Sequence, residues 1–369
     1  MSGTLVGGVT AVVGPGQPDD GAGGRPPGYA RPVTGRQGSS GRQGSSGGDW
    51  PGVRLHVVTG KGGTGKTTVA AALALALAEG NRRVLLMEVE GRQGLAQLFD
   101  CPPLPYDERR VAVAPGGGEV LALAVDPEAA LMDYLEMFYN LRRAGGMLKK
   151  LGAIDFATTV APGIRDVLLT GKAIEAVKRR DHGVPAYDAV VLDAPPTGRI
   201  TRFLNVNTAV AGLAKVGPIH TQAEAVMAVM RSPRTAVHLV TLLEEMPVQE
   251  TLDGIDELRA TGLPVGAVVI NQVRASVLSP QTLDGALDGS LVAAGVAAAG
   301  LGGRRAAAET IDALVAEAAD HADRLLLQAQ ERARVVAAGT PVYELPEVTN
   351  VDLGALYTLA NRLSAQGMT

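Results

Sequence analysis

The stretch GKGGTGKTT, residues 60–68, decides how the rest of this sequence is interpreted. It fits the pattern G-x-x-x-x-G-K-[ST] of a phosphate-binding loop, with the fixed positions at Gly60, Gly65, Lys66 and Thr67. In such a loop, backbone N–H groups point at phosphate oxygens, the lysine reaches the β- and γ-phosphates, and the hydroxyl can ligate Mg²⁺. We therefore expect a nucleoside triphosphate, ATP, to bind here together with Mg²⁺.

The loop carries more glycine and more positive charge than the pattern requires. Gly62, Gly63 and Gly65 have no Cβ, which lets the backbone curl around an anion. A second lysine, Lys61, follows the first glycine, where an ordinary phosphate loop needs no cation. The alternative is a glycine-rich turn that holds lysines by chance.

The flanking sequence favours the phosphate loop over that alternative. Residues 53–58, VRLHVV, have the apolar content of a short strand. Residues 67–79, TTVAAALALALAE, are dense in helix formers, and Gly80 ends that pattern. A strand, a glycine loop and a helix are the required context, because the helix N-terminus adds a partial positive charge for the anion.

The composition of the whole chain excludes several classes of protein. A length of 369 residues gives room for one large α/β domain or two small ones. A net charge of −4 and an aromatic content of 3% give no reason to expect a nucleic-acid partner. The single cysteine, Cys101, permits no disulfide within the chain and indicates a reducing, cytoplasmic compartment. The longest apolar run, residues 69–78, is too short to cross a membrane, and the chain begins without the basic residues of a signal peptide.

Residues 1–50 are rich in Gly, Ser and Pro and include a tandem repeat, GRQGSS, at 35–40 and 41–46. Such a segment cannot bury enough apolar surface to offset its conformational entropy, so we predict a disordered tail. It is either a tether or the product of an upstream start codon. The ATPase domain is expected to occupy residues 51–369.

Within that domain, strands and helices alternate. The predicted strands are 54–59, 83–88, 120–125, 187–193, 236–241, 266–271 and 341–344. Several are continuous aliphatic runs, which is typical of strands that are buried on both faces. The prediction is an α/β fold with a doubly wound, mostly parallel sheet that binds ligands beyond the carboxyl ends of its strands. Two regions without strands, near 128–180 and 275–338, are predicted helical additions.

A second motif lies at residues 189–193, AVVLD, an apolar strand that ends in the carboxylate of Asp193. A strand-terminal aspartate is expected on the Mg²⁺ side of a phosphate-loop site. The alternative is an aspartate that caps the next helix. The following APPTGRITRF places proline and glycine around Thr197, in a stiff loop that could sense the γ-phosphate.

With both motifs in place, the chain resembles a known family. KGGTGKTT resembles the deviant phosphate loop of the MinD/ParA/ArsA group, and DAPPTGRITRFL resembles the DTAPTGHTLRFL segment of its arsenite-pump and tail-anchored-protein-targeting ATPase branch. The resemblance continues through PGIRDVLL, HLVTLLEEMPVQET and VVINQV and covers roughly residues 53–365. It is strongest to the actinobacterial anion-transporting ATPases, whose genes commonly occur as paired paralogues. It implies a P-loop NTPase of the SIMIBI type that hydrolyses ATP.

The resemblance assigns roles to single residues. Lys61 matches a lysine that reaches across a dimer interface to the partner's nucleotide, and Asp193 matches the switch II aspartate. Asn271 matches an asparagine that reads adenine, and Pro346 matches a proline that packs on it. The switch I aspartate that positions the attacking water is replaced here by Glu90, which keeps the carboxylate on a side chain that is one methylene longer.

The complete set of predicted site residues follows from the motif and the resemblance together. The catalytic residues are Lys61, Lys66, Glu90 and Asp193; the cofactor-binding residues are Gly60, Gly62, Gly63, Thr64, Gly65, Lys66, Thr67, Thr68, Asn271 and Pro346; the metal ligands are Thr67 and Asp193. Arg92, and Arg199 where the family has histidine, are either phosphate-sensing or surface salt-bridge residues.

Three functions remain open from the sequence. The first is a dimeric switch ATPase, a homodimer or a heterodimer with a paralogous ATPase, that couples nucleotide-driven closure to a client or membrane partner. The second is a weakly catalytic nucleotide-binding subunit of such a heterodimer. The third, a DNA-partitioning or septum-positioning ATPase, is disfavoured by the DAPPTGRITRF segment. An arsenite pump is disfavoured because As(III) needs several thiols. We expect the protein in the cytoplasm, or peripheral to the membrane.

Overall fold

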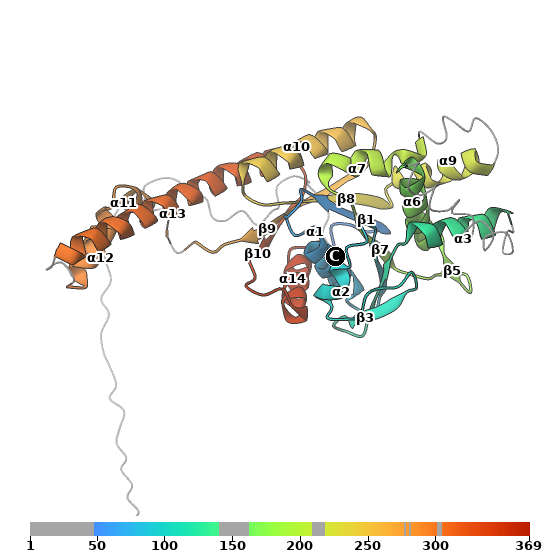
Figure 1. The fold of residues 1–369 in the computed structure, drawn as a ribbon, viewed down its shortest axis with the longest axis horizontal. Coiled ribbons are helices and arrows are strands. Elements are labelled where there is room, and N and C mark those ends of the chain that lie inside the picture. Colours follow the sequence, from blue (N-terminus) through green and yellow to red (C-terminus); the bar gives the residue numbers. More distant parts are fainter. Residues whose placement is uncertain (1–47, 140–161, 209–217, 277, 280–281, 301–304) are drawn as a thin grey trace, which may run out of the picture. The chain divides into compact units, whose positions relative to one another are not determined.

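The computed structural model describes residues 48–139, 162–208, 218–276, 278–279, 282–300 and 305–369 (Figure 1). The expected tail, residues 1–50, lies outside this description except for its last three residues. Two of those bond to the C-terminal part of the chain. The Asp49 N–H donates to the carbonyl of Gly367 at 2.7 Å. The Tyr343 hydroxyl donates to Asp49 Oδ2 at 2.7 Å and accepts from Trp50 Nε1 at 3.2 Å.

An eight-stranded sheet forms the centre of the fold, in the order β10-β9-β8-β1-β7-β2-β4-β3. The strands are β1 Leu55–Gly60, β2 Arg83–Glu88, β3 Arg109–Val113, β4 Glu119–Ala124, β7 Ala189–Asp193, β8 Thr235–Thr241, β9 Val265–Val273 and β10 Val342–Pro346. A separate two-stranded hairpin pairs β5 Arg180–Asp181 with β6 Val184–Pro185. Every neighbouring pair in the large sheet is parallel except β3 with β4. The predicted mostly parallel sheet is confirmed.

All seven predicted strands are present, with ends that differ from the prediction by at most two residues. The sequence analysis missed β3, the antiparallel edge strand. Its sequence, RRVAV, begins with two arginines and is mostly solvent-facing, so it lacks the continuous aliphatic pattern of the buried strands. Arg110 instead forms an ion pair with Glu119 of β4 at 3.1 Å.

Helices cover both faces of the sheet (Figure 1). Because side chains alternate along a strand, Val57 of β1 joins the core on one face and Val58 joins the core on the other. The first core includes residues of α3 Pro127–Tyr139, α6 Pro162–Lys178, α7 Thr197–Leu204, α9 Pro218–Met230 and α10 Glu245–Ala260. The second includes residues of α1 Lys66–Ala78, α2 Gly94–Leu98 and α14 Leu353–Ala365. The sheet is therefore doubly wound, as predicted.

The two predicted helical additions contain helices where they are described. Within 128–180 these are α3 and α6, and residues 140–161 lie outside the described residues. Within 275–338 they are α11 Leu283–Leu287, α12 Ser290–Ala298 and α13 Arg305–Ala337. The C-terminal end of α13 is tied to α10, where Arg334 donates to Gln249. No helix in the part of the chain that the structure describes is long and apolar enough to span a membrane.

Two histidines are buried side by side in the central strands. His56 of β1 and His238 of β8 are 1% and 0% exposed, and His56 Nδ1 lies 3.1 Å from His238 Nε2. The Ala267 N–H donates to His238 Nδ1 at 3.1 Å, and Trp50 packs its ring against His238 edge-on. Burial lowers the pKa of His56 to about 4 and lowers that of His238 as well, so both rings are neutral at pH 7.

Candidate functional site

The glycine-rich loop connects β1 to α1 at the carboxyl edge of the sheet, where a doubly wound fold binds its ligands. Two of its glycines are required by the surroundings. At Gly60 a Cβ would lie 2.2 Å from the carbonyl oxygen of Val240. At Gly65 φ is +85°, and a Cβ would lie 2.4 Å from Asn271 Nδ2. Gly63 also has a positive φ, whereas Gly62 does not, and the expected role of Gly62 in curling the loop stays a prediction.

Bonds within the loop and from β9 fix its shape. The Thr64 hydroxyl donates to the carbonyl of Lys61 at 2.9 Å and closes the loop on itself. Asn271 Nδ2 donates to the carbonyl of Thr64 at 2.9 Å. Asn271 is only 6% exposed, so this bond is shielded from water. The structure therefore brings Asn271, 207 residues away in sequence, onto the phosphate loop.

The loop ends at the first turn of α1, which Lys66, Thr67 and Thr68 form. The Thr67 hydroxyl donates to Asp193 Oδ2 at 2.7 Å, so the two predicted metal ligands are in direct contact. Asp193 is the last residue of β7, which pairs with β1. The two motifs that the sequence analysis found therefore meet at one place.

The Asp193 carboxylate is buried, and among the described residues only one of its two oxygens is hydrogen-bonded. It is 7% exposed, and within the described part of the chain its Oδ1 atom has no hydrogen-bond partner. Burial raises the pKa of Asp193 to about 7, against the lowering effects of the Thr67 hydrogen bond and the Lys66 charge, while Glu88 and Glu90 raise it further. A cation beside Asp193 would supply the missing partner and favour the ionised form. Oxygen ligands from a threonine and an aspartate suit Mg²⁺, so the residues present fit that ion.

A second buried carboxylate, Glu88, adjoins Asp193 and was not predicted as a site residue. It ends β2, pairs with Asp193 in the register of the sheet and is 2% exposed. Its oxygens accept from the N–H groups of Gly94 at 3.1 Å and Leu95 at 3.5 Å, at the start of α2. A carboxylate at the end of an apolar strand was the signal that could have found it. Because both oxygens bond to the backbone, its role here is to fix the segment after β2.

Lys61 and Lys66 have different surroundings, although they share one loop. Lys66 starts α1, and its charge acts on Asp193. Lys61 Nζ lies 3.8 Å from Glu250 Oε2 of α10, and both side chains are about a third exposed, at 31% and 32%. This long ion pair is weak, since partly exposed pairs contribute about 0.2–1 kcal/mol. Lys61 is therefore held, but loosely.

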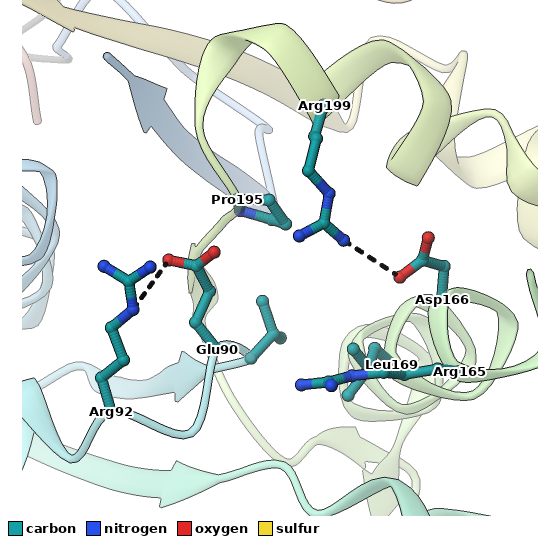
Figure 2. Close-up of a pocket in the computed structure, with 8 residues that line it drawn as sticks. Glu90, Arg92, Arg165, Asp166, Leu169, Pro195 and Arg199 are labelled. Atoms are coloured by element: carbon teal, nitrogen blue, oxygen red, sulfur yellow. Dashed lines mark ion pairs between the residues drawn. The ribbon is translucent and has the colours of Figure 1, made fainter. Parts of the chain in front are cut away.

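Glu90 lies in the segment between β2 and α2 and lines a pocket of about 230 Å³ (Figure 2). The pocket is lined by Val89, Glu90, Arg92, Arg165, Asp166, Leu169, Pro195 and Arg199. Arg92 Nε lies 3.8 Å from Glu90 Oε2, and Arg199 lies 3.9 Å from Asp166 Oδ1. Sequence reasoning named Glu90, Arg92 and Arg199 but missed Arg165 and Asp166, although their PGIRDVLL segment is one of those that carry the family resemblance.

Pro346 is the last residue of β10 and pairs with Val273 of the neighbouring strand β9, across a register shift. Asn271 belongs to the same strand β9. Pro346 therefore lies at the same edge of the sheet as the phosphate loop. The structure shows no further contact that would assign Pro346 to a nucleotide base, and that role stays a prediction.

Comparison with known proteins places this site in a family of ATPases. The family model for anion-transporting ATPases matches residues 53–232, which include the phosphate loop, Asp193 and all the residues of the Glu90 pocket. ATPase BagA from Mycobacterium tuberculosis is 54% identical over 329 residues, covering 86% of this chain and 96% of that protein. ATPase GET3 from Lachancea thermotolerans is 26% identical over 258 residues, covering 58% of this chain and 71% of that protein.

Proposed function

The chain belongs to the anion-transporting ATPase family and is an ATPase, and from this premise we propose that it is a dimeric switch that closes around Mg²⁺-ATP. One observation carries the proposal: two lysines of one loop face different environments. The charge of Lys66 acts on the Asp193 carboxylate and lowers its pKa, whereas Lys61 is 3.8 Å from Glu250 of a neighbouring helix. A cation that is loosely held away from its own loop is available to a second nucleotide across a twofold interface.

The residues of one subunit divide the work of ATP binding. The loop amides and Lys66 bind the phosphates, and Asn271 holds the loop in shape through Thr64. Thr67 and Asp193 would hold Mg²⁺, which when bound neutralises charge on the β- and γ-phosphates. Closure excludes water from the site and strengthens these electrostatic interactions.

Glu90 is the better candidate for orienting the attacking water. The other nearby carboxylate, Glu88, already accepts two backbone N–H groups. Among the described residues, Glu90 has no closer partner than Arg92, at 3.8 Å, and it lines the pocket. Its carboxylate is therefore available to accept a hydrogen bond from the attacking water when substrate is present.

Substitution of the two lysines tests the switch. Lys66→Ala should abolish ATP binding or turnover, measured by titration calorimetry and phosphate release. Lys61→Ala should retain ATP binding but lose ATP-dependent dimer formation and turnover, whereas Lys178→Ala, a lysine of α6 far from the loop in sequence, should change neither. Normal turnover by Lys66→Ala would defeat the proposal, and so would normal closure by Lys61→Ala.

The Glu90 position favours a second candidate, a weakly catalytic subunit of a heterodimer with a paralogous ATPase. Glutamate is one methylene longer than aspartate, and a misplacement of about 1 Å can cost on the order of 100-fold in rate. ATPase rates of the purified chain alone and mixed with a paralogue separate the two candidates. Rapid turnover by the chain alone would eliminate the second one.

We further propose that α3, α6 and α11–α13 transmit closure to a client or membrane partner. The support is the attachment of α13, which bonds to α10 through Arg334 and Gln249, while α10 carries Glu250, the partner of Lys61. The single cysteine supports a cytoplasmic location for this work. Affinity capture from cells, with nucleotide trapped by a non-hydrolysable analogue, should bring down a partner that is absent from the Lys66→Ala sample.

A further inference from the structure

The pocket beside Glu90 contains a surplus of positive charge. Arg92, Arg165 and Arg199 line it against only two carboxylates, those of Glu90 and Asp166. Three different parts of the fold supply the arginines: the segment after β2, helix α6 and helix α7 (Figure 2). Arg92 and Arg199 are 76% and 61% exposed, so water screens much of their mutual repulsion, and an anion between them would gain contacts from separate elements.

The guanidinium groups of Arg92, Arg165 and Arg199 also have N–H donors that no described residue accepts. Each arginine carries five N–H donors in a fixed fork. The contacts of Arg92 with Glu90 at 3.8 Å and of Arg199 with Asp166 at 3.9 Å are too long to be hydrogen bonds. Arg165 extends from α6 into the pocket, and no hydrogen bond or ion pair joins it to another described residue (Figure 2).

We propose that this pocket binds a tetrahedral oxyanion of the phosphate type, with Arg165 and Arg199 as its main ligands. Guanidinium groups bind such anions through paired N–H···O bonds, which are shorter and stronger than neutral hydrogen bonds. The volume of about 230 Å³ leaves space for the anion with several water molecules. The inference rests on the proposed ATPase function, since it concerns where phosphate goes after hydrolysis.

The Asp166 carboxylate supplies negative charge to the arginines until the anion binds. Its side chain is only 13% exposed, and burial raises its pKa, an effect that Arg199, Arg165 and Arg202 oppose. It balances part of the arginine charge at long range. An incoming oxyanion offers Arg199 a closer partner, so binding is expected to break the 3.9 Å contact between α6 and α7.

The position of the pocket connects it to the nucleotide. Pro195 lines it and lies two residues after Asp193, the predicted Mg²⁺ ligand, and Glu90 lines it as well. Two sources can therefore supply the same anion: phosphate released from ATP, or a free oxyanion from solution. Both are recognised by the same donors.

Titration calorimetry of the full chain with inorganic phosphate, in the presence of Mg²⁺-ADP, tests the site. Arg165→Gln and Arg199→Gln should each weaken phosphate binding about tenfold or more, because each removes charge-assisted bonds. Arg202→Gln, on the same helix as Arg199 but outside the pocket, should stay within about twofold of the unaltered chain. Equal phosphate affinity in all four proteins, or no binding in any, would overturn the proposal.

Single-turnover kinetics with a fluorescent phosphate sensor identifies the source. If phosphate comes from ATP, the Arg165→Gln and Arg199→Gln variants should release it earlier relative to bond cleavage. If release is unchanged while phosphate affinity is lost, the anion enters from solution, and the site stands. Failure of the ATPase proposal would appear separately, as loss of ATP binding or turnover in the unaltered chain, because phosphate titration needs no turnover.

Discussion

Replacing Glu250 by glutamine should strengthen ATP-dependent dimer closure. In the structure, Lys61 Nζ lies 3.8 Å from Glu250 Oε2, and closure as proposed requires that contact to break. With both side chains about a third exposed, at 31% and 32%, the pair contributes about 0.2–1 kcal/mol. A symmetric dimer breaks two such pairs, so Glu250→Gln should favour closure by about 0.4–2 kcal/mol, roughly 2- to 30-fold in the dimerisation constant.

Analytical ultracentrifugation with a non-hydrolysable ATP analogue measures this constant directly. The effect should shrink at high salt, because screening already weakens the pair in the unaltered chain. Glu245→Gln, which removes the same charge from the first turn of the same helix, is the matched control and should change closure little. Weaker closure in Glu250→Gln would refute the reasoning, because it would mean that Glu250 assists the closed state instead of restraining Lys61.

Three further predictions concern the loop and the core. Below pH 6.5 the histidines of the unfolded chain become protonated, whereas the buried His56 and His238 of the folded chain stay neutral. The free energy of unfolding, measured by urea denaturation, should therefore fall by about 3 kcal/mol for His56 alone as the pH drops toward 4, and a flat profile would contradict the neutral pair. Asn271→Ala removes the bond to the loop carbonyl and should weaken ATP binding about tenfold in calorimetry, and an unchanged affinity would show that the loop needs no support from β9. Gly65→Ala should lower the free energy of unfolding by about 1–3 kcal/mol, while Gly62→Ala, whose Cβ meets open space, should not; equal losses would argue against backbone strain.

The central sheet could be predicted because its strands are buried on both faces and therefore read as unbroken aliphatic runs. Ala189–Asp193 and Arg83–Glu88 were found for that reason, with errors of two residues or fewer at their ends. The edge strand Arg109–Val113 escaped because one of its sides faces water, which allows arginine and removes the pattern. Whether a strand lies at the centre or at the edge of the sheet is decided by the folded chain, and an edge strand has a weaker aliphatic pattern in its sequence.

The sequence by itself determined the phosphate loop, because the geometry around a phosphate demands glycines and a lysine at fixed short spacings. It also located Asp193, whose place at the end of an apolar strand is a local signal. Only the tertiary structure decided which distant groups meet there. Glu250 beside Lys61, Asn271 on the Thr64 carbonyl, and the arginines that converge with Asp166 are joined by packing across separate strands and helices. Local spacing carries no information about those distances, because they are fixed by how the whole sheet is wound.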